Sequence, residues 1–324
     1  MSKPATPPVP AAAEGAETAE REIDVAILKQ ALPYMRKHRK KTIVVKFGGH
    51  LVEDKAALRS LAADVALLHH IGLRLCIVHG GGPQATHLSE RLGLAPQFVE
   101  GRRITDDETL EVAKMVFAGK INIEVLSAMR NEGLRAVGLS GVDGDIVRAR
   151  RREVKEVRDP RTGTTRAVDF GHVGDIERVD TSLLRVLLDN GYVPAVASLG
   201  ADDKGNVLNI NADTVALEIA VDLKADKFIN MTQVPGVLRS LQDPESLLSD
   251  LTVPEAEALI RDGTVVSGMI PKVRSCVEAV RRGVSRAHIL NGLEPHAMLL
   301  ELFTIRGAGT MITLDPVPPG DDGA

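Results

Sequence analysis

The 324-residue sequence predicts an α/β fold in which helices cover both faces of a mostly parallel sheet. Short runs of β-branched and apolar residues alternate with amphipathic helical stretches, as in repeated βαβ units. Two of these runs, at 42–47 and 74–79, end abruptly in glycines, and open parallel sheets bind ligands at such strand ends. Hydrophobic residues make up 44% of the chain and aromatic residues only 2%, so the core between the layers must be aliphatic.

Ahead of the first strand, residues 25–40 predict a helix that is kinked at Pro33, because proline removes a backbone donor. The expected strands share β-branched or aliphatic runs and lie at 42–47, 74–79, 135–140, 193–200, 227–232 and 286–292. The expected helices share an amphipathic pattern and lie at 54–72, 83–92, 107–133, 211–225 and 267–283. Between 145 and 180, two strand-like segments flank the turn "DPRTG", which predicts a β-hairpin insertion. No linker divides the chain, so we expect one α/β unit with an N-terminal and a C-terminal half.

Composition and charge exclude several classes of protein. The net charge is −4, but the acidic excess lies in two tails, 1–24 and 313–324, which we expect to be disordered. The body between them carries no charge excess that would demand a nucleic acid or a membrane as partner. We find no apolar run of membrane-spanning length, no signal or transit peptide, and no metal-ligand spacing around the two cysteines. We therefore expect a soluble cytoplasmic protein with reduced cysteines and no protein metal ligands.

Two lysines indicate where an anion could bind. Lys46 lies near the end of the first strand, and an unpaired buried ammonium is costly, so we expect an anionic partner for it. The alternative is a lysine that extends along the strand end into water. Lys272 follows the glycine of "SGMIPK" and begins a helix, where a bound anion would offset its charge. A plain surface position is the alternative for Lys272.

Three short motifs add polar groups that could bind a ligand. The turns "FGG" and "HGGGP" offer backbone N–H groups to an anion, although such turns also arise for packing reasons. In "NINAD", Asn211 or Asp213 could simply cap a helix. Alternatively, the polar side chains of this motif could bind a polar substrate and hold a lysine in place. In "GRRIT", the guanidinium of Arg103 suits a carboxylate. The segment "GGGPQA" also matches a dinucleotide-binding fingerprint, but weakly, because Pro83 falls inside it.

Eight motifs occur in one order: "VKFGG", "HGGGP", "GRRIT", "LSGVDG", "NINAD", "VPGVL", "GMIPK" and "GAGTMI". In this the chain resembles the N-acetylglutamate kinases of the amino acid kinase family, over about residues 25–312. The resemblance implies a three-layer αβα sandwich around a mainly parallel open sheet, with N-acetyl-L-glutamate on about 41–195 and ATP on about 196–312. It implies phosphorylation of the γ-carboxylate of N-acetyl-L-glutamate in arginine biosynthesis, with Mg²⁺ held mainly by phosphate oxygens.

The resemblance also assigns roles to residues of this chain. Lys46 and Lys272 would stabilise the transferring phosphoryl group, and Asp213 would orient both lysines. The implied phosphate-binding backbone is Gly48, Gly49 and Gly81, and the implied substrate-binding residues are Gly81, Gly82, Arg103 and Asn209. A carboxylate is already ionised at neutral pH, so catalysis needs positioning and charge neutralisation rather than a general base. We therefore expect His50 and His79, which adjoin the site, to be structural.

The resemblance extends to regulation. The helix at 25–40 resembles the extension of arginine-inhibited members, which form hexamers as trimers of dimers, so we expect a homo-oligomer. His288, Glu301 and Gly307 resemble their arginine site, in which Glu301 would take the cationic end of L-arginine. The alternative for Glu301 is an ordinary acid on a helix surface.

Two departures from the family pattern leave alternatives open. Gln233 stands where members usually carry aspartate, and His50 follows "KFGG" where a small polar residue is usual. A catalytically impaired arginine sensor is one alternative, and a family member that acts on aspartate, carbamate or UMP is another. The third is the dinucleotide oxidoreductase that "GGGPQA" suggests.

Overall fold

The structure, a computed structural model, describes residues 32–33, 35–99, 101–158, 164–240, 242–304 and 307–316. The expected tail at 1–24, residues 25–31 of the expected kinked helix and residues 317–324 lie outside the described residues. Residues 35–38 are helical and lead into the first strand. The last strand includes Thr313, which is buried, so the folded body extends one residue into the range expected as a tail.

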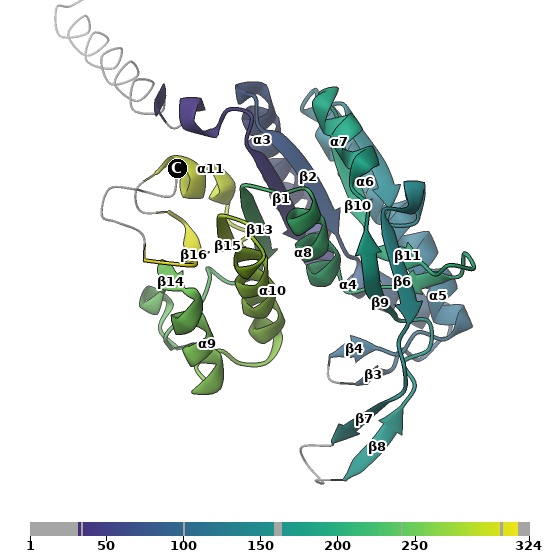
Figure 1. Cartoon of the computed structure of the whole chain (residues 1–324). Helices are drawn as coiled ribbons and strands as arrows, with labels where there is room; N and C mark the ends of the chain where they lie inside the picture. The colour runs from purple at the N-terminus through teal and green to yellow at the C-terminus, as the bar shows by residue number, and fades with distance from the viewer. Residues whose placement is uncertain are drawn as a thin grey trace, which may run out of the picture.

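An eight-stranded sheet forms the centre of the fold, in the order β14-β16-β15-β13-β1-β2-β10-β5 (Figure 1). Every neighbouring pair is parallel except β15 and β16, which are antiparallel. The strands are β1 (Thr42–Phe47), β2 (Arg74–His79), β5 (Ala136–Ser140), β10 (Val193–Ala197), β13 (Lys227–Thr232), β14 (Asp250–Thr252), β15 (Arg286–Asn291) and β16 (Gly309–Thr313). The predicted α/β fold with a mostly parallel sheet is confirmed.

Helices cover both faces of this sheet and make the three layers. They are α2 (Gly49–Glu53), α3 (Lys55–Ile71), α4 (Gly82–Arg91), α5 (Asp107–Lys114), α6 (Asn122–Asn131), α7 (Ser182–Asp189), α8 (Ala212–Asp222), α9 (Val253–Arg261), α10 (Ile270–Arg281) and α11 (Ala297–Phe303). One aliphatic core lies between the sheet and α3, α4, α6 and α11, and a second lies between the sheet and α7 to α10. Figure 1 shows α8 and α10 side by side in front of the sheet. Burial on both faces explains why these strands carry aliphatic residues on both sides.

The helix expected at 107–133 is continuous but not uniform. A π-helical segment, Met115–Ile121, joins α5 to α6. This segment packs against the glycine turn after β2, because a Cβ on Gly81 would lie 2.3 Å from Ile121 and 2.7 Å from Phe117. π-Helical turns are often found at functional sites.

The insertion between 145 and 180 is built from antiparallel strands, as predicted. β6 (Val147–Arg151) pairs with β9 (Gly174–Val179), and β7 (Lys155–Arg158) pairs with β8 (Thr165–Val168). β11 (Leu199–Ala201) and β12 (Val207–Asn209) extend the β6–β9 pair into a four-stranded sheet. A short hairpin, β3 (Phe98–Val99) with β4 (Arg102–Arg103), lies close to the point where the β7–β8 hairpin leaves the body of the fold in Figure 1. No helix among the described residues is long and apolar enough to cross a membrane.

Candidate functional site

Lys46, Asp213 and Lys272 meet at the carboxyl end of the central strands. Lys46 Nζ lies 2.6 Å from Asp213 Oδ1, and Lys272 Nζ lies 3.3 Å from Asp213 Oδ2. The three side chains come from β1, α8 and α10, so residues 226 positions apart form one cluster, which we call the lysine–aspartate cluster. The anionic partner expected for Lys46 is therefore present, and the reading of Lys46 as a lysine that extends into water is wrong.

Burial strengthens the electrostatic interactions within this cluster. Lys46 is 5% exposed and Asp213 is 7% exposed. Burial lowers the pKa of Lys46, and Lys272 acts in the same direction, although Asp213 opposes both. Burial alone would raise the pKa of Asp213, but Lys46 and Lys272 together hold it well below its usual range. With both lysines protonated the cluster carries a net charge of about +1, which suits an incoming anion.

Local chain geometry fixes Asp213 at the start of α8. Asn211 is the N-cap, and its side-chain oxygen accepts hydrogen bonds from the backbone N–H groups of Asp213 (2.8 Å) and Thr214 (3.4 Å). The capping role that we considered for Asn211 or Asp213 therefore belongs to Asn211. Asp213 is left to pair with the lysines.

The two predicted glycine turns border the cluster. Gly48 and Gly81 are the N-caps of α2 and α4, so the N–H groups at these helix starts have no intrahelical acceptor. A Cβ on Gly49 would lie 2.1 Å from Gln84 Oε1, whereas a Cβ on Gly48 or Gly82 would meet nothing within 4 Å. Gly49 and Gly81 are therefore required by close packing, and Gly48 and Gly82 leave the backbone open to a ligand.

A cavity of about 260 Å³ opens beside these turns, and we call it the smaller cavity. Arg103 lines it and donates through Nη2 to the carbonyl of Gly82 (2.9 Å) and to Thr86 Oγ1 (2.6 Å). The Nη1 atom of Arg103 is buried and has no hydrogen-bond partner in the described part of the chain. Asn209 also lines this cavity and donates to Thr105 Oγ1 at 3.1 Å. The unpaired guanidinium nitrogen could bind a carboxylate.

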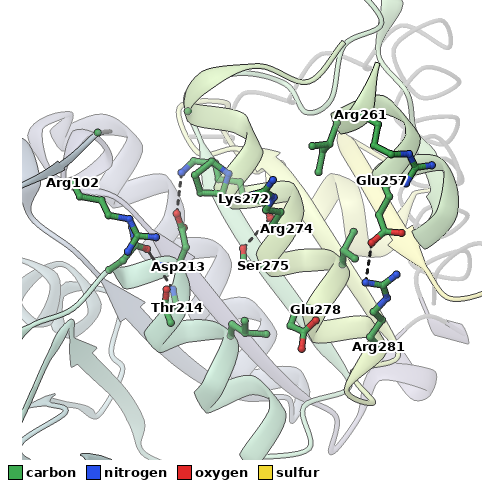
Figure 2. Close-up of a pocket in the computed structure, with 17 residues that line it drawn as sticks. Arg102, Asp213, Thr214, Glu257, Arg261, Lys272, Arg274, Ser275, Glu278 and Arg281 are labelled. Carbon is green, nitrogen blue, oxygen red and sulfur yellow. Dashed lines mark hydrogen bonds and ion pairs between the residues drawn. The ribbon is translucent and has the colours of Figure 1, made fainter. Parts of the chain in front are cut away.

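The larger cavity, of about 1070 Å³, lies between α8, α9 and α10 (Figure 2). Figure 2 shows Lys272 directed toward Asp213 at one end of it, and the Arg281–Glu257 ion pair (2.8 Å) on α10 and α9. Cationic side chains outnumber acidic ones on its walls: Arg102, Arg261, Lys272, Arg274 and Arg281 against Asp213, Glu257 and Glu278. Gly101, Arg102 and Asn211 line both cavities, so the two cavities meet at the lysine–aspartate cluster. A polyanion suits the larger cavity.

The two histidines differ in environment. His79 is fully buried at the end of β2 and stacks on Phe47 with ring centroids 6.2 Å apart. Burial lowers the pKa of His79 to about 4, so its ring is neutral at pH 7. His50, on α2, is half exposed, and its Nδ1 lies 3.5 Å from Glu53 Oε2. The structural role expected for both rings stays a prediction.

His288 on β15, Glu301 on α11 and Gly307 shortly before β16 also come together in a second cluster; a Cβ on Gly307 would lie 2.7 Å from Glu301 Oε2. His288 Nδ1 lies 2.6 Å from Glu301 Oε1, and Oε2 accepts from the N–H groups of Ala308 (2.7 Å) and Gly309 (3.2 Å). The side chain of Glu301 is 6% exposed, so the reading of Glu301 as a helix-surface acid is wrong. Burial acts to raise the pKa of Glu301, but His288 and the Ala308 N–H hold it below its usual value.

Sequence reasoning missed several lining residues. Arg102 borders both cavities, whereas we singled out only its neighbour Arg103 in the same motif. The α9 wall was missed entirely, although Thr252 and Glu255 form a capping box that marks its start. Gln233, one of the two departures from the family pattern, is exposed and lines neither cavity. The described residues include no group of three or more His, Cys, Asp or Glu that could hold a metal ion.

Comparisons with known proteins place the chain in a family. The model of the amino acid kinase family matches residues 41–291. The chain is 46% identical to the acetylglutamate kinase of Methanothermobacter thermautotrophicus over 89% of this chain and 99% of that protein. It is 49% identical to the acetylglutamate kinase of Methanocorpusculum labreanum over 89% of this chain and 96% of that protein.

Solved structures extend the comparison. The N-acetylglutamate synthase from Neisseria gonorrhoeae, complexed with coenzyme A and N-acetyl-glutamate, superimposes with a TM-score of 0.76 and 31% identity. The match covers 90% of this chain and 64% of the synthase. The same synthase has been solved with coenzyme A and L-arginine, with a TM-score of 0.72. Carbamate kinase from Giardia lamblia, at 20% identity and a TM-score of 0.59, shares the fold.

Proposed function

Because the chain belongs to the amino acid kinase family, we propose that it is an acetylglutamate kinase, which transfers the γ-phosphoryl group of ATP to the γ-carboxylate of N-acetyl-L-glutamate. The match to curated acetylglutamate kinases over nearly their whole length supports this acceptor. The observation that carries the chemistry is the contact of Lys46 and Lys272 with Asp213 where two cavities meet.

The reaction explains why two lysines and no base are required. A carboxylate oxygen of the acceptor attacks the γ-phosphorus, the bond from that phosphorus to the β–γ bridging oxygen breaks, and ADP leaves. No proton moves, so the protein must bring two anions into line and neutralise charge on the transferring group. Lys46 and Lys272 do this from two sides while Asp213 orients them, and the N–H groups of the glycine turns contribute further donors.

The acceptor occupies the smaller cavity in this proposal. Arg103 is supported as the carboxylate ligand by its buried Nη1, which has no partner among the described residues. Asn209, Gly81 and Gly82 line the same cavity. In this proposal the two glycines border the acceptor carboxylate that is phosphorylated. A volume of about 260 Å³ suits one small amino acid derivative better than a nucleotide.

ATP occupies the larger cavity with its γ-phosphate at the lysine–aspartate cluster. A kinase of this family uses ATP and a metal ion, and we propose that the ion is Mg²⁺. Both oxygens of Asp213 already face lysines, so the residues present fit an ion held by phosphate oxygens and water. Mg²⁺ bound in this way would neutralise phosphate charge.

An acceptor panel tests the proposal. Purified protein is incubated with MgATP and N-acetyl-L-glutamate, L-aspartate, carbamate or UMP, and ADP release and hydroxylamine-trapped acyl phosphate are measured. We expect hydroxamate with N-acetyl-L-glutamate at a kcat/KM at least about 100-fold above the other acceptors. Turnover with another acceptor would show that the chain is a family member with a different substrate. Binding of arginine without any turnover would support the sensor alternative.

We further propose that L-arginine inhibits the enzyme at the cluster of His288, Glu301 and Gly307, and that the protein is a cytoplasmic hexamer. Support comes from the buried carboxylate of Glu301, which could pair with a guanidinium. The synthase that this chain resembles also binds L-arginine. Glu301→Gln should weaken inhibition at least about tenfold and leave uninhibited kcat unchanged. A dimer by light scattering that keeps full activity in millimolar arginine would contradict both parts.

A further inference from the structure

We propose that Asn230 on β13 is a positioning residue, which holds the Asp213 carboxylate so that Lys46 and Lys272 are correctly placed. The proposal rests on the kinase function proposed above. Asn230 is not expected to touch either substrate, because it is 0% exposed and lines neither cavity.

The place of Asn230 in the sheet is unusual for a polar side chain. It is in register with Lys46 on the neighbouring strand β1, and parallel strands in register present such residues on the same face. The other central residues of that face are apolar, among them Val44, Phe228 and Ile289. A buried amide in such surroundings is costly unless it makes hydrogen bonds. The contacts that it does make therefore indicate its role.

The first of those contacts goes to the carboxylate of Asp213 in the lysine–aspartate cluster. Asn230 Nδ2 donates to Asp213 Oδ1 at 3.1 Å, the same oxygen that lies 2.6 Å from Lys46 Nζ. Lys272 approaches the other oxygen at 3.3 Å. Asn230 thus fixes one edge of the carboxylate and leaves the second edge to Lys272. Because the amide is neutral, it adds a donor without adding charge to the cluster.

A second contact connects the same amide to the helix that carries Lys272. Nδ2 lies 3.5 Å from Ser275 Oγ, and Ser275 Oγ in turn donates to the backbone carbonyl of Lys272 at 2.9 Å. One side chain on β13 therefore reaches both α8, through Asp213, and the first turns of α10. This placement is expected of a group that sets the distance between the two lysines.

The unsatisfied half of the amide argues against a purely stabilising role. Asn230 Oδ1 is buried and has no hydrogen-bond partner in the part of the chain that the structure describes. Turning the amide over would place that oxygen against the carboxylate of Asp213, so the opposite orientation is excluded by charge. An apolar residue of similar size would remove the orphaned acceptor. The chain keeps the amide although it is half satisfied.

Asn230→Leu tests the proposal, because it keeps the number and branching of the side-chain heavy atoms and removes the donor. We expect kcat to fall about 10- to 100-fold, KM for N-acetyl-L-glutamate to stay within about twofold, and Tm to stay equal or rise. A purely structural role predicts that kcat at a permissive temperature is retained while Tm falls. Ile229→Val is the matched control on the same strand, because Ile229 packs in the opposite core. It should lower Tm slightly and leave kcat unchanged.

Asn230→Asp gives a readout that does not depend on the leucine variant folding. A protonated carboxyl can donate to Asp213 as the amide does, but an ionised one repels it. The ratio of variant to wild-type kcat should therefore rise as the pH falls from 8 to 6. An unchanged kcat in Asn230→Leu, or a pH-independent ratio in Asn230→Asp, would overturn the proposal. Absence of turnover in the wild-type protein would instead overturn the proposed function, and this proposal with it.

Discussion

Asp213→Asn removes the carboxylate that contacts both Lys46 and Lys272 while keeping the shape of the side chain. At an effective dielectric constant of about 20, the contacts at 2.6 Å and 3.3 Å correspond to about 6 and about 5 kcal/mol of gross Coulomb attraction. Desolvation offsets much of this, and loss of one partner of a buried pair usually costs about 3–5 kcal/mol. The variant can avoid part of that cost only if a lysine gives up its proton.

Lys46 is the lysine that should lose its proton. Burial already lowers the pKa of Lys46, and Asp213 is the group that opposes this shift. Without Asp213 the pKa of Lys46 falls further, so a neutral amine faces the phosphoryl group and kcat should drop at least about 100-fold. The remaining activity should increase as the pH is lowered, because Lys46 regains its proton.

Steady-state rates of hydroxamate formation between pH 6 and 9, with Tm measured on the same samples, test this reasoning. Asp222→Asn is the matched control. Asp222 lies at the other end of the same helix, and its Oδ2 accepts hydrogen bonds from the N–H and the hydroxyl of Thr181. This variant should lower Tm and leave kcat and its pH dependence unchanged. If Asp213→Asn retained a kcat within about fivefold of wild type with an unaltered pH profile, the charge argument for the cluster would be refuted.

Three further perturbations have distinct outcomes. A Cβ on Gly81 would lie 2.3 Å from Ile121, so Gly81→Ala should lower the free energy of unfolding by about 1–3 kcal/mol and lower kcat. A Cβ on Gly82 would meet nothing within 4 Å, so Gly82→Ala should leave Tm unchanged and raise KM. Calorimetry and initial rates would distinguish the two variants. Arg103→Lys replaces a planar fork with a point charge and should raise the KM for N-acetyl-L-glutamate about tenfold or more with less effect on kcat; an unchanged KM would remove Arg103 from the acceptor site. Burial lowers the pKa of Lys227 from 10.5 to about 7, so the unfolded chain binds more protons between these values and the free energy of unfolding should rise with pH from about 7 to 10. Urea unfolding should show this slope in the wild-type protein, and Lys227→Met should flatten it.

The parts of the fold that could be predicted from the sequence are those whose signal is local. The strands at 42–47 and 74–79 match their predicted bounds, because each is a mainly aliphatic run that ends at a glycine. Short elements were missed: α2 has five residues, and β14 has three. Such segments are defined by the neighbours they pack against rather than by periodicity.

The candidate site also contains residues that the sequence predicts and residues that it does not. An anionic partner for Lys46 was predictable, because burying an ammonium without an anion is costly, and the family resemblance supplied its identity, Asp213. Asn230 was not, since its strand "KFINMT" does not show which residue of another strand lies beside it. Its importance appears only when sheet register places it next to Lys46 and α8 brings Asp213 within 3.1 Å. Which of Arg102 and Arg103 faces which cavity also depended on how the short β3–β4 hairpin is placed.

The most direct test of the central claim is the rate of acyl phosphate formation from N-acetyl-L-glutamate and MgATP by Lys46→Ala, compared with the wild-type protein. If phosphoryl transfer depends on charge neutralisation by the lysine–aspartate cluster, kcat should fall at least about 1000-fold while KM for the acceptor changes little. A Lys46→Ala variant with wild-type kcat would show that the cluster does not stabilise the transferring phosphoryl group.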